Sequence, residues 1–395
     1  MGFLVLKKGR ERSLLHSHPW VFSGAVEKIV EVKQNGETVE IRSFDGERLA
    51  IASFSEFSQI IARVWTFDAN EKINKDYLLK QIQNAQKLRL SMDMDSNTNA
   101  YRIINTEADG IPGLIVDKYD KYLVCQFLSA GAEFWRENII EILTEEFNPV
   151  GIYERSDTDS RTKEGLEKRT GVIYGQEPPS EIALNEEGVK YYVDIKTGHK
   201  TGFYLDQREN RRKIKDYCLG KDVLNGFSYT GGFGIAALVA GANRVTNIDS
   251  SAESLNMVEK NLVFNELDPS KSEQVEGDVF IILRTYRDSG KSFDLIILDP
   301  PKFAESKNQL EGALRGYKDI NLLAFKLLKP GGILFTFSCS GHIVPELFRK
   351  VVSDAAIDSG KKVQQIAVLQ QSADHPVLMS FPESFYLKGL ICKVW

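Results

Sequence analysis

Residues 222–250 read DVLNGFSYTGGFGIAALVAGANRVTNIDS, and this stretch decides the fold of the second half of the chain. An apolar strand runs into a turn with three glycines at 231, 232 and 234, a helical stretch follows, and a second strand ends at Asp249. Glycines let the backbone approach a ligand closely, and an acidic residue at the end of the next strand can accept hydrogen bonds from both ribose hydroxyls. The sequence therefore predicts a site for a nucleoside cofactor.

A plainer interpretation of the same stretch stays open. The glycines could only shape a tight turn, while Asp249 caps the helix that begins near Ala252. The turn does not follow the GxGxxG spacing of dinucleotide binders, and the chain has no GxxxxGK[ST] phosphate loop, so S-adenosylmethionine is a better candidate than NAD or ATP. Residues 276–279 (EGDV) end a third strand, where the Asp278 carboxylate could bond an adenine amino group.

From about residue 190 onward, apolar runs alternate with helical stretches, which is typical of a parallel sheet covered by helices on both faces. The expected strands are Asp222–Leu224, Arg244–Ile248, Gln274–Glu276, Leu295–Leu298 and Ile333–Phe337. Residues 1–70 instead carry short β-rich runs separated by Gly-containing turns, which favours a small β-barrel-like domain. Its clearest strands are Thr38–Arg42, Leu49–Ser53 and Ile60–Thr66.

Between these halves, the pattern predicts a small α+β domain. A charged helix is expected over 72–92, a loop over 93–99, and one further helix at Glu133–Phe147. The expected strands are Leu114–Asp117, Tyr122–Phe127 and Gly151–Glu154, and the segment Gly175–Gly188 is expected to be a connecting hairpin or linker. The predicted domains are therefore 1–70, 71–188 and 189–395.

Two strand ends carry groups with chemistry. Residues 293–303 read FDLIILDPPKF, in which two prolines stiffen a loop that would present Asp299 at the ligand edge of the sheet. The alternative is a rigid strand terminator without function. Residues 333–343 read ILFTFSCSGHI, and Cys339 follows a strand that would adjoin the Asp299 strand. A thiol beside a carboxylate suits covalent catalysis on an electron-poor ring, although buried cysteines are usually inert packing residues.

Basic residues cluster in two places. Residues 195–215 hold seven Lys or Arg against Asp206 and Glu209, a local net charge of +5 that could bind phosphates or form a solvated helix face. Gln207 and Arg208, at the start of the expected helix, are better placed to reach a ligand. Near the N-terminus, four cations beside Trp20 suit an RNA-contacting patch: Lys7, Lys8, Arg10 and Arg12. His16 and His18 have no accompanying ligand set, so no metal site is expected.

Composition restricts the function classes further. The 395 residues carry a net charge of −5, so a nucleic-acid surface would have to be regional. Four widely spaced cysteines without a CxxC pair argue against a disulfide framework or a zinc ribbon and favour a reducing cytoplasm. Neither a signal peptide nor a membrane span is expected. Nothing in the residues requires a dimer, and a homodimer is compatible with them.

The chain resembles, across nearly its whole length, the bacterial large-subunit (23S) ribosomal RNA cytosine-C5 methyltransferases of the RlmI (YccW) type. The segments that carry the resemblance are LKKGRERSLLHSHPWVFSGAV, YRIINTEADGIPGLIVDKY, ERSD at 154–157, GHKTGFYLDQRENR, LNGFSYTGGFG, LDPPKF, FSCSGH and DHPVLMSFPESFYLKG. The resemblance implies an N-terminal PUA RNA-binding domain, a small central domain, and a Rossmann-like class I methyltransferase with a mostly parallel seven-stranded sheet.

Carried over by motif, the resemblance also implies roles for individual residues. Phe227–Gly231 would face the methionine part of S-adenosylmethionine, Asp249 the ribose, and Asp278 with Val279 the adenine. Asp299 would hold the target base, and Cys339 would add to C6 of cytosine, after which C5 accepts the methyl group and loses its proton. The remaining implied contacts are Gln207, Tyr229, Thr230 and Ser250 for the cofactor, and Lys200, Arg208 and Lys302 for large-subunit ribosomal RNA.

Three functions compete at this point. The leading one is formation of 5-methylcytosine in ribosomal RNA. A second is methylation of a guanine or adenine nitrogen, because related enzymes with the same DPP loop modify guanine; Cys339 would then be a bystander. Another group of RNA cytosine-C5 methyltransferases has a second cysteine where this chain has Pro301, which leaves the base for the C5 proton unassigned. The third is a non-catalytic RNA-binding or ribosome-assembly factor that retains a cofactor pocket.

Overall fold

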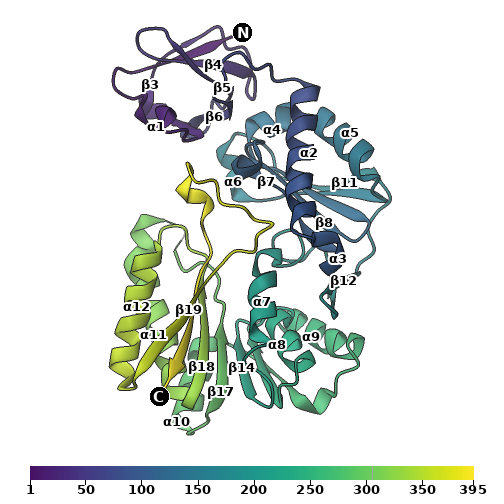
Figure 1. Cartoon of the computed structure of the whole chain (residues 1–395), viewed down its shortest axis with the longest axis vertical. Helices are drawn as coiled ribbons and strands as arrows, with labels where there is room; N and C mark the ends of the chain where they lie inside the picture. Colours follow the sequence, from purple (N-terminus) through teal and green to yellow (C-terminus); the bar gives the residue numbers. More distant parts are fainter. Residues whose placement is uncertain (305) are drawn as a thin grey trace. The chain divides into compact units, whose positions relative to one another are not determined.

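The computed structural model describes residues 1–304 and 306–395, which form two compact units (Figure 1). The first unit contains Met1–Leu184, Val193–Leu205 and Ala373–Ser384, and the second contains Asn185–Tyr192, Asp206–Ser372 and Phe385–Trp395. Each unit is therefore assembled from separate stretches of chain, so its core depends on residues that are far apart in sequence.

A six-stranded sheet forms the N-terminal part of the first unit. Its strands are β1 (Phe3–Leu6), β2 (Trp20–Phe22), β3 (Val26–Val30), β4 (Thr38–Arg42), β5 (Arg48–Phe54) and β6 (Ile60–Thr66), in the order β2-β6-β5-β4-β1-β3, with a short helix α1 (Arg12–Leu15). The three expected strands are confirmed, and Gly36 and Gly46 supply the positive φ of the turns on either side of β4. Strands β1, β2 and β3 were not named from the sequence, because they are short: four, three and five residues.

A second sheet, in the order β11-β10-β9-β8-β7, continues the first unit. Its strands are β7 (Ala100–Asn105), β8 (Leu114–Tyr119), β9 (Tyr122–Phe127), β10 (Gly151–Ser156) and β11 (Arg169–Gly175), with helices α2 (Lys75–Ser91), α3 (Met94–Asn97), α4 (Ala130–Phe134), α5 (Arg136–Phe147) and α6 (Asp159–Lys163). The helix expected at Glu133–Phe147 is confirmed over Arg136–Phe147, but its start is wrong: Trp135 leaves helical geometry and separates α5 from α4, which Ser129 caps. The loop expected at 93–99 contains the short helix α3.

A connecting hairpin is present, but it lies later than the expected segment Gly175–Gly188, because Gly175 ends β11 and the second strand of the hairpin runs beyond Gly188. It consists of β12 (Ile182–Glu186) and β13 (Val189–Val193), with Gly188 at a φ of +87° between them. A glycine is suited to this position because a side chain at positive φ is strained.

The second unit is built on a seven-stranded sheet in the order β16-β15-β14-β17-β18-β20-β19. Its strands are β14 (Asp222–Gly226), β15 (Arg244–Asp249), β16 (Ser272–Glu276), β17 (Phe293–Leu298), β18 (Leu328–Ser338), β19 (Val363–Gln370) and β20 (Lys388–Val394). Strand β20 runs antiparallel to both neighbours, whereas β16 to β18 pair in parallel. This confirms the expected mostly parallel, Rossmann-like sheet.

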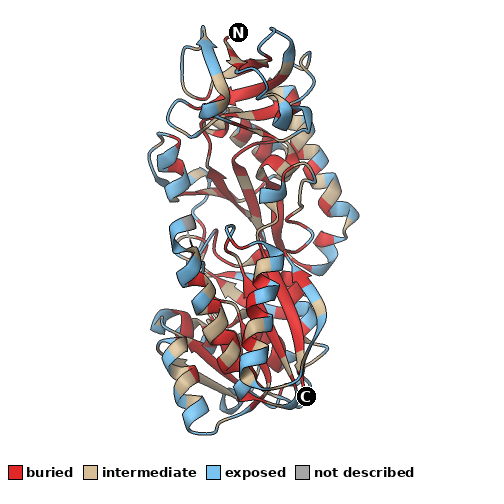
Figure 2. Ribbon diagram, turned by 90° about the vertical axis from the view of Figure 1, so that its left-hand side faces the viewer, coloured by how far each residue is buried: buried red, intermediate tan, exposed pale blue. Residues whose placement is uncertain are grey.

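Helices cover both faces of this sheet (Figure 1). They are α7 (Arg208–Ile214), α8 (Gly232–Val239) and α9 (Ala252–Phe264) on one side, and α10 (Val279–Asp288), α11 (Leu310–Leu327) and α12 (Pro345–Ser359) on the other. Figure 2 shows the strands buried and the outer helix faces exposed. Helix α11 buries Tyr317, Ile320 and Phe325 completely, and each such side chain contributes about 1.5–3 kcal/mol to folding. None of the described helices has the length and apolar character that crossing a membrane requires.

The segment Ala373–Ser384 belongs to the first unit although it lies near the C-terminus. Arg89, which is completely buried, pairs with both carboxylate oxygens of Asp109 at 2.6 and 2.8 Å and donates to the backbone oxygen of Asp374 at 2.8 Å. The Asp374 carboxylate accepts from the backbone of Arg102 at 2.9 Å. A buried polar network therefore fastens this late segment to β7 and α2.

Candidate functional site

The motif residues of the second unit lie where strands of its sheet end. Phe227 follows β14, Asp249 ends β15, Asp299 follows β17 and Cys339 follows β18. Parallel pairing aligns these ends, because Gly226 is opposite both Ile248 and Leu298 in the register. The side chains named from sequence therefore lie along one edge, which is where open parallel sheets bind their ligands.

The turn after β14 has a strained backbone. Phe227, Tyr229 and Gly231 all have positive φ, at 60°, 47° and 82°, and a Cβ at Gly231 would lie 2.9 Å from a methyl group of Val258. Non-glycine residues rarely adopt this conformation, which costs on the order of 1–3 kcal/mol each and is found mainly at functional sites. The surrounding contacts must therefore hold the turn in place.

Asp249 supplies that support. One carboxylate oxygen accepts a hydrogen bond from the Tyr229 amide at 2.7 Å, and the other accepts from the Ser251 amide at 3.0 Å. The interpretation of Asp249 as the cap of the next helix is wrong, because Ser251 is the N-cap and its hydroxyl accepts from the Ser254 amide at 3.1 Å. Each carboxylate oxygen has two acceptor sites, so Asp249 retains capacity for ribose hydroxyls.

Buried polar atoms around the turn fit a polar ligand. The hydroxyls of Ser228 and Thr230 and the amide nitrogen of Gln207 have no hydrogen-bond partner within the described ranges 1–304 and 306–395. A buried polar group without a partner costs about 1–3 kcal/mol, so such atoms are usually paired. Gln207 precedes α7, as expected, and is almost completely buried. These three groups suit the amino acid part of S-adenosylmethionine.

The adenine end of the edge differs in part from expectation. Asp278 is the N-cap of α10, and its carboxylate accepts from the Phe280 amide at 2.7 Å, a role that sequence reasoning did not weigh. The rings of Phe227, Phe280 and Phe303 form a cluster with centroids 5.7–6.4 Å apart. Sequence analysis did not name Phe280 as a site residue. The only hint in the sequence is that Phe280 directly follows Val279, a proposed adenine contact that is buried in the structure.

The structure brings the two catalytic candidates together. The thiol of Cys339 lies 3.9 Å from the backbone oxygen of Pro300, which directly follows Asp299. Cys339 is partly exposed, whereas the other three cysteines are buried. Burial raises the pKa of the Cys218 thiol to about 11 and that of Cys392 to about 12, and it also raises the pKa of Cys125. Cys339 therefore differs from the inert cysteines in position and exposure.

Sequence reasoning missed two polar side chains beside Cys339. The Tyr317 hydroxyl lies 3.4 Å from the hydroxyl of Ser340, and burial raises the pKa of Tyr317 to about 12. Lys388 donates to the Ser340 backbone oxygen at 2.7 Å, and burial lowers its pKa to about 8. Both come from elements far along the chain, so no local pattern could connect them with the cysteine.

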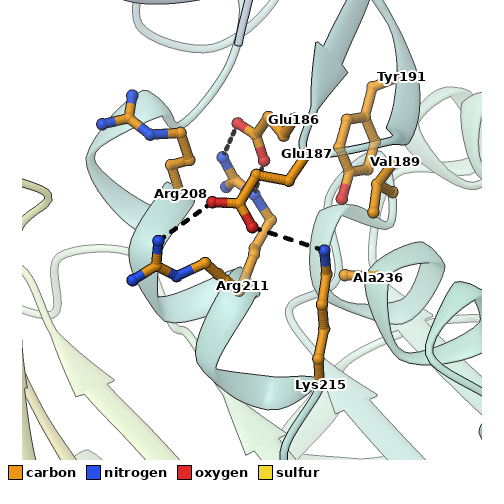
Figure 3. Close-up of a pocket in the computed structure, with 9 residues that line it drawn as sticks. Glu186, Glu187, Val189, Tyr191, Arg208, Arg211, Lys215 and Ala236 are labelled. Atoms are coloured by element: carbon orange, nitrogen blue, oxygen red, sulfur yellow. Dashed lines mark hydrogen bonds and ion pairs between the residues drawn. The ribbon is translucent and has the colours of Figure 1, made fainter. Parts of the chain in front are cut away.

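Much of the basic charge after residue 200 is neutralised within the second unit. Arg211 pairs with Glu186 at 2.5 Å, and Glu187 forms ion pairs with Arg212 at 3.1 Å and with Lys215 at 3.9 Å. Figure 3 shows Glu186 and Glu187 beside Arg211 and Lys215. Arg211 is buried, so it belongs to an internal ion pair rather than to a solvated face or a phosphate site. The expected local charge of +5 therefore overstates what a ligand would meet.

The remaining RNA candidates lie on both units. Arg208 begins α7 and Lys302 is exposed on the DPP loop, both in the second unit. Lys200 belongs to the first unit, with its ammonium over the Tyr204 ring. Lys7, Lys8, Arg10 and Arg12 are exposed around β1 and α1, and none forms an ion pair within residues 1–304 and 306–395. No cluster of possible metal ligands occurs among the residues that the structure describes.

Known proteins resemble the chain in sequence and in fold. Residues 4–67 match the PUA-like domain family, and residues 170–367 match the S-adenosylmethionine-dependent methyltransferase family. "Ribosomal RNA large subunit methyltransferase I" of Aeromonas salmonicida is 52% identical over 391 residues, 99% of each chain, and the protein of that name from Shewanella amazonensis is 50% identical over 392 residues, again 99% of each. A crystallised methyltransferase in complex with SAH has a TM-score of 0.87 at 24% identity, with complete coverage of both chains.

Proposed function

Because the chain belongs to the ribosomal RNA large subunit methyltransferase I family, we propose that it methylates C5 of a cytosine in large-subunit (23S) ribosomal RNA, with Cys339 as nucleophile. It is an S-adenosylmethionine-dependent methyltransferase of Rossmann-like fold, preceded by a PUA-like domain. The observation that carries the proposal is the position of the Cys339 thiol, 3.9 Å from the loop that begins with Asp299.

The cofactor supplies an electrophilic methyl group when it is bound. In the proposal, the turn at Phe227–Gly231 and Gln207 hold its amino acid part, since the hydroxyls of Ser228 and Thr230 and the amide nitrogen of Gln207 are buried without a partner in the described residues. Asp249 and Ser250 hold the ribose, and Asp278 with Val279 holds the adenine beside the aromatic cluster. These residues would hold the cofactor along the same sheet edge that carries Cys339.

The target cytosine needs activation because its C5 is a weak nucleophile. Addition of the Cys339 thiolate to C6 makes the ring enamine-like, so that C5 can attack the methyl group. Asp299 favours the addition by protonating or hydrogen-bonding N3. The C5 proton then leaves and the S–C6 bond breaks with its electron pair returning to sulfur, which releases the Cys339 thiolate; S-adenosylhomocysteine is the other product. Pro301 occupies the position of the second cysteine found in another group of these enzymes, so the proton acceptor is water or a neighbouring polar group.

RNA binding in this proposal uses both units. Lys7, Lys8, Arg10 and Arg12 surround β1 and α1, and their charges are unpaired within residues 1–304 and 306–395. Lysine and arginine bind phosphates without reading sequence, so these residues supply affinity rather than choice of nucleotide. Lys200, Arg208 and Lys302 are the further proposed RNA contacts.

The test is methyl transfer from labelled S-adenosylmethionine to ribosomal RNA from a strain that lacks this gene. Wild type should form 5-methylcytosine, and Cys339→Ala should lose transfer while its cofactor affinity changes by less than about three-fold. Cys218→Ala, in which a buried thiol is removed by the same substitution, is the matched control and should stay active. Mass spectrometry of the digested RNA identifies the modified atom. Methyl groups on a guanine or adenine nitrogen, or undiminished transfer by Cys339→Ala, would refute the proposal.

A further inference from the structure

A buried lysine, Lys388, is hydrogen-bonded to the residue that follows Cys339. Lys388 is the first residue of β20, and the pairing of β18 with β20 places it opposite Ser338, the residue before the cysteine. Its side chain is only 4% exposed, and its Nζ donates to the backbone oxygens of Ser340 and Tyr386, both at 2.7 Å. The amine is therefore fixed to the residue that directly follows Cys339.

Burial and two neighbouring ionisable groups set the pKa of Lys388. Burial lowers the pKa of Lys388 to about 8, the positive charge of Lys302 lowers it too, and negative charge on Cys339 raises it. Tyr317 faces the same residues from α11, and burial raises its pKa to about 12, so it stays neutral near pH 7. Asp299 is the carboxylate on this side of the sheet, and its charge acts on Tyr317. Lys388, at the start of β20, is therefore the basic group that interacts with the Cys339 thiol.

The number of hydrogen bonds suits an amine that changes its protonation state. A neutral amine has two N–H groups and one lone pair, and the two carbonyl acceptors of Lys388 match those two N–H groups. An ammonium at the same place keeps both bonds and gains a third N–H. Neither state breaks the anchoring of the Ser340 segment.

We propose that Lys388 is a positioning residue whose ammonium group stabilises the Cys339 thiolate. The S–H bond breaks, the proton passes to solvent, and the positive charge of the Lys388 ammonium offsets the negative charge of the thiolate. This step rests on the proposed function, in which the thiolate adds to C6 of the base. When the S–C6 bond later breaks, the ammonium stabilises the departing thiolate.

The test is the rate at which iodoacetamide alkylates Cys339 in the full-length protein, measured from pH 6 to 10 by mass spectrometry of its peptide. The wild-type profile should have its midpoint below about 8.5, the value of an ordinary thiol. Lys388→Met should move the midpoint upward by about one pH unit, whereas Lys388→Arg, which keeps the positive charge, should leave it low. The midpoint is the readout because the intrinsic reactivity of a thiolate also changes with its pKa.

Lys393→Met is the matched control. Lys393 lies near the other end of β20, with its ammonium over the Trp395 ring, so the same substitution there should leave the profile of Cys339 unchanged. A wild-type midpoint at or above 8.5 overturns the proposal, even if Lys388→Met fails to fold. Equal midpoints for a folded Lys388→Met and wild type also overturn it. Alkylation needs no RNA, so these results are independent of whether Cys339→Ala abolishes methyl transfer.

Discussion

The support that Asp249 gives to the cofactor turn leads to a quantitative prediction for Asp249→Asn. The carboxylate accepts from the amides of Tyr229 and Ser251, and an asparagine can accept from only one of them while its NH₂ group opposes the other. A hydrogen bond to a charged group contributes about 1.5–3 kcal/mol, which corresponds to about a 10-fold to 100-fold change in an equilibrium constant. Because Tyr229 has a positive φ and depends on this contact, we expect S-adenosylmethionine to bind Asp249→Asn about 10-fold to 100-fold more weakly.

Titration calorimetry with S-adenosylmethionine measures this effect directly. The matched control is Ser251→Ala, which removes the neighbouring hydrogen bond to the Ser254 amide. Loss of this helix cap should lower the free energy of unfolding by about 1 kcal/mol and leave cofactor affinity within about two-fold of wild type. The reasoning fails if Asp249→Asn binds the cofactor as wild type does, or if Ser251→Ala weakens binding equally.

Three further predictions concern other parts of the chain. Arg89→Met leaves Asp109 buried without its partner, so the first unit should lose about 3–5 kcal/mol of stability in urea unfolding; a loss below about 1 kcal/mol would contradict this. For Lys388 the folded pKa of about 8 lies below the unfolded value, so the unfolded state binds more protons between about pH 8 and 10. Wild-type stability should therefore rise with pH in this window, and unfolding curves of Lys388→Met should lack that rise. Replacing Lys8 and Arg10 by Gln should weaken binding to ribosomal RNA and reduce the slope of log affinity against log salt by about 1.5, whereas an unchanged slope would exclude them as phosphate contacts.

Local patterns were sufficient for the elements that carry the site. Strand β17 is apolar at every position except Asp294 because both faces are covered, and the motif residues follow β14 and β17 directly. The neighbouring positions of Asp299 and Cys339 followed from parallel pairing alone, since equivalent ends of parallel strands meet at one edge. The family resemblance assigned parts of the cofactor and the target base to these residues, but it did not change where the residues were expected to lie.

The errors in the fold have local physical causes. The break between α4 and α5 falls at Trp135, an aromatic residue that the helical periodicity does not distinguish from its neighbours. The alternative of Asp249 as a helix cap stayed open from the sequence because aspartate and serine both cap helices, and the structure shows that Ser251 is the N-cap. The basic run was overestimated because Arg211 meets Glu186, a partner 25 residues away.

The residues that no pattern could place are those supplied by long-range pairing. Lys388 reaches the Cys339 segment because β20 inserts between β18 and β19, a connection across about fifty residues that leaves no periodic trace. Burying a lysine disfavours its charged form, and this is tolerated here because two backbone oxygens receive its N–H groups. The same burial lowers the pKa of Lys388 only to about 8, so the ammonium still predominates near pH 7 and can stabilise a thiolate. The strand that closes the sheet thus also provides the one buried cation next to the proposed nucleophile among residues 1–304 and 306–395.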